Sequence, residues 1–359
     1  MAEIDSLLRT MVEKDGSDLH LSVGLPPRAR ISGSIQSIGD KELTAPIMER
    51  MLKEIVPERR WNDYLERRDL DLAYEIPGLA RFRGNFFYTH WGQAAVLREI
   101  PVKILTLEQL GLPEAVKKLC TLNEGLVVVT GPTGSGKSTT LAAMIDYINT
   151  NFCRHIITIE DPIEFVHPVK KSIIVHREVG EHTKSFPAAL KGAMRHDPDI
   201  LLIGEMRELE TMKLALSCAS MGMLVFGTLH TNNAPKTVDR IINSFPADDQ
   251  NQVRVMLSGC LSGIVAQLLC ARVPKGRCAV HEILLQHEAL ANTVRSGQIS
   301  NIRAIIEGSG AEGMVLMDTS LMSRVKDGTI EAREAYMKAA NKAAFVSLLK
   351  PGDLEQEGL

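Results

Sequence analysis

The sequence has few aromatic residues, no excess of charge of one sign and no long apolar run. Aromatic side chains make up 4% of the 359 residues, and the net charge is −3. These values argue against a general nucleic-acid-binding protein, which usually has a basic domain and aromatic stacking platforms. No apolar run approaches the length of a membrane span, and the acidic segment at residues 1–16 lacks the basic and apolar regions of a signal peptide. We therefore expect a cytoplasmic protein without membrane insertion.

The cysteines are not arranged for metal binding or catalysis. None of the six forms a C-x-x-C pair, so a structural zinc site is not expected. No nucleophile context surrounds any of them, and in a reducing compartment they are expected to act as small, buried apolar side chains. They are Cys120, Cys153, Cys218, Cys260, Cys270 and Cys278.

The first hundred residues predict a compact α+β unit. Strand-like alternation and turn signals such as Pro77-Gly78 and Trp91-Gly92 divide the segment into short elements. Helical patterns are expected at 3–14 and 45–68, and strands at 18–23, 28–32, 35–38, 69–75, 80–88 and 94–100. Residues 1–100 are thus predicted as a smaller N-terminal domain, and residues 101–113 as a linker.

From residue 114 the pattern changes to alternating strands and helices, which is typical of a parallel α/β sheet. Strands are expected at 126–130, 155–160, 200–204 and 223–228, and helices at 137–149, 185–195, 208–220 and 235–243. After Asp248 the chain is expected to be mostly helical, and the polar segment 350–359 is expected to be a flexible tail. This second, α/β domain is predicted to cover residues 114–359.

The segment Gly131-Pro-Thr-Gly-Ser-Gly-Lys-Ser138 matches the phosphate-binding pattern G-x-x-x-x-G-K-[ST] at every fixed position. Its backbone N–H groups and the N-terminus of the following helix would form an anion site. Lys137 is expected to reach the β- and γ-phosphates, and the Ser138 hydroxyl to ligate Mg²⁺. The alternative is a glycine turn with a chance lysine, which the strand before it and the helix after it argue against. The candidate binding residues are Gly131, Thr133, Gly134, Ser135, Gly136, Lys137, Ser138 and Thr139.

Acidic residues end two other apolar strands. Glu205 follows the run at 200–204, where it could orient or deprotonate an attacking water or hold Mg²⁺ through water. Glu160 and Asp161 end the strand at 155–160, and in a parallel sheet these strand ends face the ligand crevice. The alternative for Glu205 is a salt-bridged acid at a strand end. A phosphate loop earlier in the chain favours the metal and water shell instead.

The strand at 223–228 is followed by His230. A lone histidine is more often a satisfied core residue than a ligand contact. Its position at the end of a strand of the same sheet favours a contact with the γ-phosphate.

Arg81, Arg83 and Arg98 lie on two predicted strands of the N-terminal unit. Arg81 and Arg83 are two residues apart, so their side chains project from the same face of the sheet. They are either solvent-exposed charges or a fork of guanidinium groups that reaches a phosphate across an interface.

Together these segments resemble the secretion-type hexameric ATPases and, more narrowly, the type IV pilus retraction ATPases of the PilT/PilU group. The phosphate loop alone would be weak for this assignment, and the acidic and histidine segments are more specific. The matching text is SDLHLSVGLPP at 17–27, ARFRGNFF at 80–87, GPTGSGKSTTLAAMIDYIN at 131–149, HIITIEDPIEFVH at 155–167, DPDILLIGEMRELET at 197–211, LVFGTLHTNNAPKTVDRIINSFPA at 224–247 and GMVLMDTSLMSRVKDGTI at 313–330.

This resemblance implies a PAS-like N-terminal domain and a RecA-like ATPase domain, with ATP and Mg²⁺ bound between them in a ring of six chains. It also implies that Glu205 is the catalytic acid, Glu160 the acid of the second strand and His230 the reader of the γ-phosphate. Arg81, Arg83 and Arg98 match the family's N-terminal arginines, and Arg277 matches a basic position near the nucleotide. The implied function is pilus retraction. The implied partner is a platform protein of the inner membrane, with which the ring associates peripherally at the pilus base.

The chain departs from the family pattern at two places. Met221-Gly-Met223 stands where many retraction motors have Thr-Gly-His, and residues 289–296 match the motif Ala-Ile-Arg-Asn-Leu-Ile-Arg-Glu only at Ala289, Asn292 and Arg295. The alternative function is therefore an accessory paralogue that binds nucleotide, hydrolyses it poorly and assembles with a competent retraction ATPase. A pilus-assembly or type II secretion ATPase is disfavoured, because those relatives usually carry an extra N-terminal domain and a four-cysteine zinc insertion.

Overall fold

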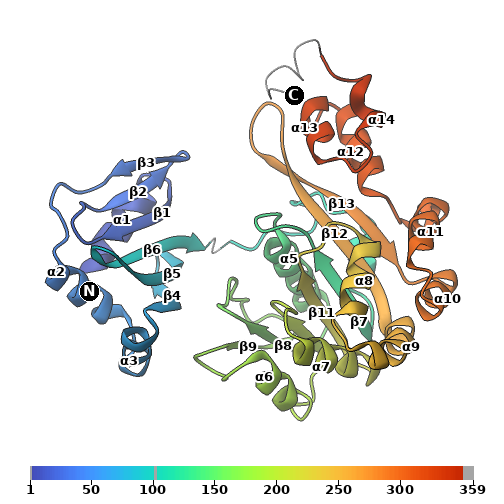
Figure 1. Ribbon diagram of the computed structural model, residues 1–359, viewed down its shortest axis with the longest axis horizontal. Helices are drawn as coiled ribbons and strands as arrows, with labels where there is room; N and C mark the ends of the chain where they lie inside the picture. Colours follow the sequence, from blue (N-terminus) through green and yellow to red (C-terminus); the bar gives the residue numbers. More distant parts are fainter. Residues whose placement is uncertain (1, 101–102, 351–359) are drawn as a thin grey trace. The chain divides into compact units, whose positions relative to one another are not determined.

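The computed structural model describes residues 2–100 and 103–350, and the chain divides into two compact units. One unit comprises Met1–Lys103 and Pro162–Val166, and the other Ile104–Asp161 and His167–Leu359. Residues 2–100 of the first unit are drawn in blue to cyan, and most of the second unit is drawn in green to red (Figure 1).

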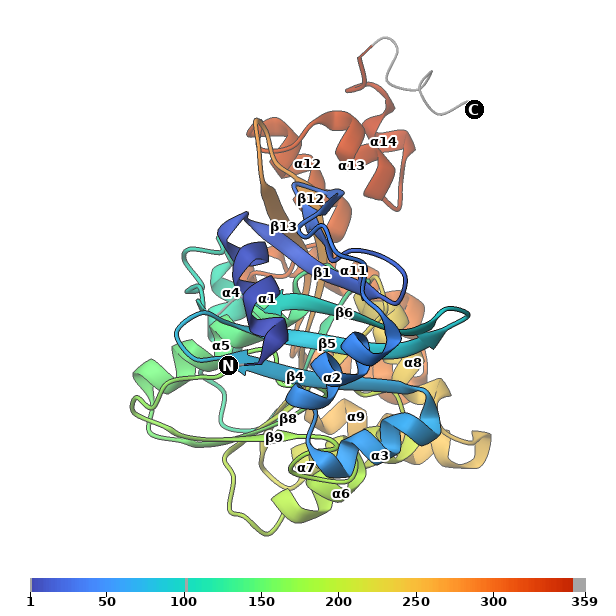
Figure 2. The same cartoon turned by 90° about the vertical axis from the view of Figure 1, so that its left-hand side faces the viewer.

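The first unit is a six-stranded sheet covered on one face by three helices (Figure 2). The strand order is β3-β2-β1-β6-β5-β4, and the described pairings are antiparallel. Apolar side chains of the helices, such as Leu8, Met51 and Trp61, pack on inward-facing Phe82 and Phe86 of the sheet. The elements are α1 Glu3–Glu13, β1 Gly16–Ser22, β2 Arg28–Ile31, β3 Ser34–Ser37, α2 Ala45–Ile55, α3 Glu58–Arg67, β4 Asp69–Ile76, β5 Ala80–Thr89 and β6 Gly92–Ile100.

The helical stretch expected at 45–68 is two helices rather than one. Helix α2 ends at Ile55, and α3 begins after Pro57, which occupies its N-cap position. A proline disfavours helical geometry at the residue before it, and Val56 is accordingly extended.

The second unit contains a seven-stranded sheet in the order β13-β12-β7-β11-β10-β8-β9. Strands β12 to β9 pair in parallel, and β13 joins β12 antiparallel at the edge. The strands are β7 Gly125–Thr130, β8 His155–Glu160, β9 Ile173–Glu178, β10 Ile200–Ile203, β11 Leu224–Leu229, β12 Leu261–Ala271 and β13 Arg277–Leu285. The predicted fold class is confirmed: an α/β phosphate-loop core preceded in the sequence by a smaller α+β unit.

Helices cover both faces of this sheet. One face packs against α4 and α5, and the other against α6 to α11, whereas α12 to α14 pack on the outer part of the β12–β13 hairpin (Figure 1). The helices are α4 Glu114–Leu119, α5 Lys137–Asn151, α6 Phe186–Ala193, α7 Leu209–Ser220, α8 Ala234–Asn243, α9 Gln250–Cys260, α10 Glu288–Ser296, α11 Ile302–Gly308, α12 Met317–Lys326, α13 Ala332–Lys338 and α14 Ala343–Val346. Short 3₁₀ helices lie at Ala247–Asp249, Ile299–Asn301 and Gly310–Glu312.

The expectation that the chain is mostly helical after Asp248 is wrong for residues 261–285, which form the β12–β13 hairpin. Residues 261–267 of β12 are all buried, because helices cover both faces of the sheet. Such a strand shows no alternation, and periodicity alone does not distinguish a short apolar run of this kind from a buried helix. The edge strand β9 was also not predicted. Residues 101–102 of the expected linker and 351–359 of the expected tail lie outside the described residues.

Candidate active site

The phosphate-loop residues connect the end of β7 to the start of α5. All six residues of β7 are buried, and α5 begins at Lys137, with Gly136 at its N-cap. Gly131, Gly134 and Gly136 have φ values of 149°, 78° and 86°, a region that side chains rarely adopt. The loop is therefore an irregular turn in front of a helix N-terminus, and this geometry suits a bound phosphate.

Within the loop, Lys137 bends back over its own backbone. Its Nζ donates to the carbonyl oxygens of Gly131 at 2.8 Å and Pro132 at 3.1 Å. Ser138 and Thr139, in the first turn of α5, are partly buried, whereas Thr133 is exposed on the loop. The ammonium group is thus held at the loop, where phosphate oxygens could take the place of the carbonyls.

Gly131 leaves no room for a side chain. A Cβ atom there would lie 2.3 Å from the carbonyl oxygen of Gln267 and 2.6 Å from Ser135 Oγ. We expect Gly131→Ala to displace the loop at a cost of about 1–3 kcal/mol and to weaken ADP binding about tenfold or more. Titration with a fluorescent ADP analogue measures this. The control is Gly259→Ala, because a Cβ at Gly259 meets nothing within 4 Å; equal affinity of the two variants would contradict the expectation.

Glu205 and His230 lie together at the ends of neighbouring strands. Glu205 follows β10, His230 follows β11, and Glu205 Oε1 lies 2.8 Å from His230 Nε2. The Glu205 side chain is 23% exposed and that of His230 is 43% exposed, so both are accessible to solvent. The pair places a carboxylate and an imidazole at the same edge of the sheet as the phosphate loop.

Arg207 is a member of this cluster that sequence reasoning missed. Its Nε donates to the same Glu205 oxygen, and this hydrogen bond and the carboxylate charge raise the pKa of Arg207. The pairing balances the Glu205 charge with a guanidinium group two residues further along the chain.

The order of the strands brings another predicted acid to the same edge. Strand β10 lies between β8 and β11, with Ile203 opposite both Ile159 and Gly227. Glu160 therefore ends β8 one strand away from Glu205, and a Cβ at Gly204 would lie 3.3 Å from the Glu160 Cα. Gly204 permits this close approach.

Side-chain hydrogen bonds hold the segment after His230. Thr130 Oγ1, at the end of β7, donates to the Thr231 carbonyl oxygen at 2.7 Å. The buried Glu282 carboxylate accepts from the backbone N–H groups of Ala234 at 2.7 Å and Met317 at 3.2 Å. Burial raises the pKa of Glu282, against the effect of these two donors. Residues 230–234 are thus tied to the phosphate-loop strand and to β13.

The predicted arginines lie on the face of the first unit's sheet that its helices do not cover. Each pairs with an acid of its own unit: Arg81 with Glu75 at 3.6 Å, Arg83 with Asp71 at 3.9 Å and Arg98 with Asp18 at 2.7 Å. Burial would raise the pKa of Asp18, but hydrogen bonds from Ser17 and Arg98 hold it below its usual value. The contact of these arginines with nucleotide remains a prediction.

Arg277 is exposed at the start of β13, opposite Ala271. Its partner Ala271 lies five residues after Ala266 on β12, and Ala266 pairs with Thr130 at the end of β7. Its role near the nucleotide also remains a prediction.

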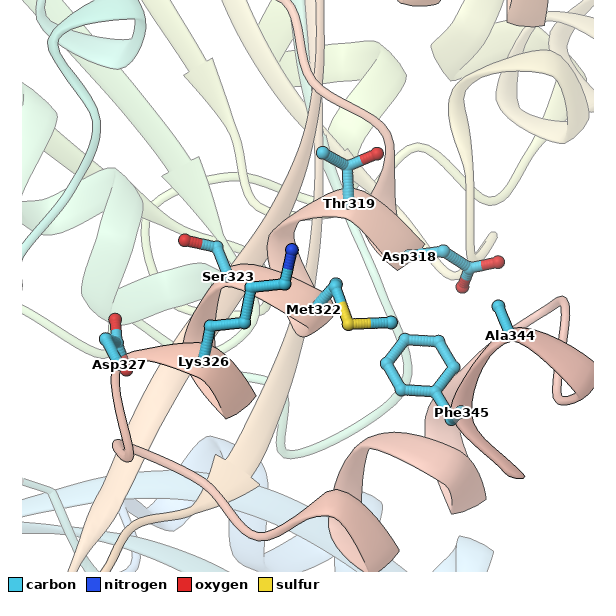
Figure 3. A pocket seen from close by; sticks show the side chains of 8 residues that line it. All are labelled: Asp318, Thr319, Met322, Ser323, Lys326, Asp327, Ala344 and Phe345. Atoms are coloured by element: carbon cyan, nitrogen blue, oxygen red, sulfur yellow. The ribbon is translucent and has the colours of Figure 1, made fainter. Parts of the chain in front are cut away.

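A separate pocket lies between α12 and α14 (Figure 3). It has a volume of about 690 Å³, and Met322, Lys326 and Phe345 are among the residues that line it. The Asp318 carboxylate at its rim accepts from the backbone N–H groups of Ala340 and Asn341. None of the residues predicted to bind nucleotide lines this pocket.

Comparison with known proteins places the chain in a family. Residues 3–345 match the family model of type II/IV secretion system proteins. The chain is 45% identical over 337 residues to the type IV pilus retraction ATPase PilT of Pseudomonas aeruginosa, covering 94% of this chain and 98% of PilT. It is 40% identical over 351 residues to the type IV pilus ATPase PilU of the same organism, covering 98% and 92%.

A solved structure gives the same assignment. The crystal structure of the pilus retraction motor PilT with bound ADP superimposes with a TM-score of 0.87 at 40% identity, covering 99% of both chains. Among the described residues, no helix is both long enough and apolar enough to cross a membrane. The chain belongs to the type II/IV secretion system protein family and, within it, to the pilus retraction ATPases.

Proposed function

We propose that this ATPase is an autonomous motor that hydrolyses ATP to retract type IV pili and so drives twitching motility. The observation that carries the proposal is the cluster of Glu205 and His230 at the same sheet edge as an intact phosphate loop. A relative with 45% identity over 94% of this chain is named as a pilus retraction ATPase, which supports the same function.

In this proposal the phosphate loop binds the nucleotide, and Glu205 acts as the general base. Lys137 exchanges its loop carbonyls for phosphate oxygens, and the backbone N–H groups of the loop orient the triphosphate. Glu205 accepts the proton of the attacking water, with its carboxylate oriented by His230 and Arg207.

Mg²⁺, held by Ser138 and, directly or through water, by Glu160 and Glu205, would supply positive charge against the phosphates. These are hydroxyl and carboxylate oxygens, the ligands that Mg²⁺ prefers, and they lie at one edge of the sheet.

The proposed motion is a closure of two domains. We assign residues 1–100 to a PAS-like domain, 101–113 to a linker and 114–359 to the RecA-like domain with its helical C-terminal part. ATP binding closes the domains, so that Arg81, Arg83 and Arg98 exchange their acidic partners for phosphate charge. Six chains in a ring pass this motion to a platform protein of the inner membrane, and the ring works in the cytoplasm at the pilus base.

A second candidate is the accessory paralogue, which binds nucleotide, hydrolyses it poorly and assembles with a competent retraction ATPase. It is favoured by Met223 and by α10, whose Thr293 and Ser296 depart from the family motif.

One experiment distinguishes the autonomous motor from the accessory paralogue. It measures Mg²⁺-dependent ATP hydrolysis by the purified protein alone, together with the native mass of the particle. The proposal predicts hydrolysis by a particle six times the mass of the 39.5 kDa chain. ATP binding without turnover until a paralogous ATPase is added would overturn it in favour of the accessory function.

A further inference from the structure

We propose that Gln267 is a positioning residue of the phosphate loop, with its amide bonded to the loop and supported from behind by His281. Gln267 lies on β12, one residue beyond Ala266, which pairs with the last residue of β7. The proposal rests on the nucleotide site described above and adds a residue from the hairpin that the sequence led us to expect as helix.

The Gln267 amide bonds the loop at two points. Its Nε2 donates to the Ser135 carbonyl oxygen at 2.6 Å, in the middle of the loop. Its Oε1 accepts from Thr140 Oγ1 at 2.7 Å, in the first turns of α5. The side chain therefore connects the loop to the helix that follows it.

Two glycines of the motif also contact Gln267. A Cβ at Gly131 would lie 2.3 Å from the Gln267 carbonyl oxygen, and a Cβ at Gly136 would lie 2.9 Å from its Nε2. The loop is therefore packed directly on this residue at both ends. Because Gly131 and Gly136 have no side chain, the loop can pack on Gln267 and phosphate can approach its backbone.

The Ser135 carbonyl oxygen decides which way the amide points. It can only accept, so Gln267 Nε2 must face it, and reversing the amide would put two acceptors in contact. Gln267 Oε1 therefore faces His281, whose Nε2 lies 3.1 Å away. Because Oε1 can only accept, His281 Nε2 is the donor there, and it completes the hydrogen bonding of the amide.

The set is buried and anchored from outside the loop. Gln267 is 2% exposed and His281 is 3% exposed, and a buried amide is costly unless its groups are paired. Ser320 Oγ, on α12, donates to the His281 carbonyl oxygen at 2.6 Å. A continuous series of hydrogen bonds therefore runs from α12 through β13 and β12 to the phosphate loop.

The first test compares Gln267→Met with wild type. Methionine has a similar shape and removes all three hydrogen bonds of the amide, so we expect ADP to bind about tenfold or more weakly. Adenosine, which has no phosphate, is expected to bind with unchanged affinity. Gln286→Leu is the matched control, because Gln286 is an exposed glutamine just after β13. Wild-type affinity for ADP in Gln267→Met would overturn the proposal, as would an equal loss for ADP and adenosine.

The second test uses His281. His281→Leu removes the donor to Gln267 Oε1, and His281→Gln restores a donor at about the same place. We expect ADP affinity to fall severalfold in the leucine variant and to return in the glutamine variant. Equal affinity of the two variants would overturn the proposal even if Gln267→Met failed to fold.

Lys137→Ala separates this proposal from the site itself. If Lys137→Ala loses ADP binding and Gln267→Met keeps it, only the positioning role fails. If Lys137→Ala binds ADP as wild type does, the proposed nucleotide site fails.

Discussion

Replacing Glu205 by glutamine is expected to lower kcat for ATP hydrolysis by about 10²- to 10⁴-fold, while ATP still binds. Glutamine keeps the shape and an oxygen that accepts from His230 Nε2, but it cannot take a proton from water. The loss is therefore in the chemical step. Steady-state hydrolysis, measured beside equilibrium binding of a fluorescent ATP analogue, separates the two.

Glu208→Gln is the matched control for this experiment. Glu208 is an exposed acid three residues along the same segment, at the N-cap of α7. It should hydrolyse ATP at close to the wild-type rate. Full turnover by Glu205→Gln would assign the proton acceptor to another residue.

Acidification is expected to destabilise the second unit through two buried histidines. Burial, with the neighbouring His176 and Lys170, lowers the pKa of His167 to about 4, although Asp146 acts in the opposite direction. Burial and the Arg324 charge lower the pKa of His281 to about 4. Both start from 6.5, so the unfolded chain binds protons between pH 6.5 and 4 that the folded chain does not.

The free energy of unfolding must therefore fall as pH decreases through this window. Each histidine contributes about 1.4 kcal/mol per pH unit, or about 3 kcal/mol over the whole window. Their contribution to stability is fully present above pH 6.5 and is lost as pH falls toward 4.

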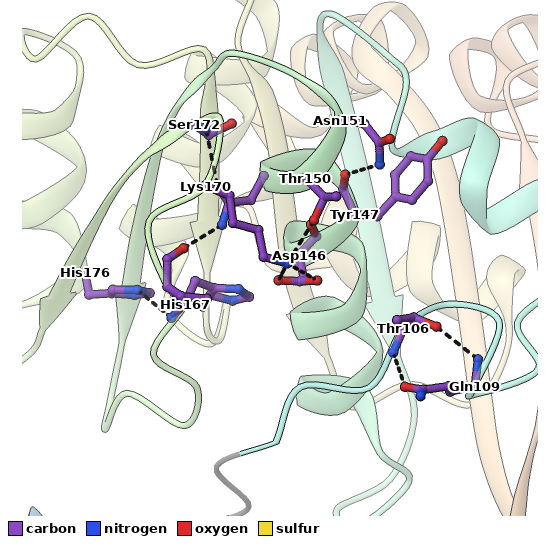
Figure 4. A network of polar contacts seen from close by, with 12 residues as sticks. Thr106, Gln109, Asp146, Tyr147, Thr150, Asn151, His167, Lys170, Ser172 and His176 are labelled. Carbon is purple, nitrogen blue, oxygen red and sulfur yellow. Dashed lines mark hydrogen bonds and ion pairs between the residues drawn. The ribbon is translucent and has the colours of Figure 1, made fainter. Parts of the chain in front are cut away.

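His167 lies in a dense polar region between α5 and β9 (Figure 4). Its ring stacks on that of His176 at 5.7 Å, and its Nδ1 is buried without a hydrogen-bond partner. Lys170 Nζ, bonded to Asp146 at 2.7 Å, adds positive charge nearby. A proton on this ring would be buried close to another cation.

Urea unfolding at a series of pH values, followed by far-UV circular dichroism, measures this effect. His167→Phe keeps a ring to stack on His176 and should remove about half of the pH dependence. His90→Gln is the control, because it also removes one histidine, but at an exposed position. A free energy of unfolding that is flat between pH 6.5 and 4.5 would contradict the burial of both rings.

The parts of the site that follow strands were predictable from sequence. Each of β7, β8, β10 and β11 is a short apolar run followed by polar residues, and parallel strands bring such ends together. Glu205 and His230 could therefore be placed beside the phosphate loop from the sequence.

The contributions of Gln267 and Arg207 were not predictable in the same way. Gln267 lies in a run buried on both faces, which has no periodicity to identify it as a strand. Arg207 lies in the irregular segment after β10, where its pairing with Glu205 depends on backbone path rather than pattern. Gln267 was a weak sequence signal for a polar contact, because a lone glutamine in an apolar run such as β12 needs hydrogen-bond partners.

The most direct test of the central claim is pilus retraction in cells whose sole retraction ATPase is this chain, recorded as retraction events on fluorescently labelled pili. An autonomous motor predicts that the wild-type chain restores retraction and that Lys137→Ala, at equal abundance, does not. If the wild-type chain hydrolyses ATP but supports no retraction until a paralogous ATPase is supplied, the account of an autonomous motor is contradicted.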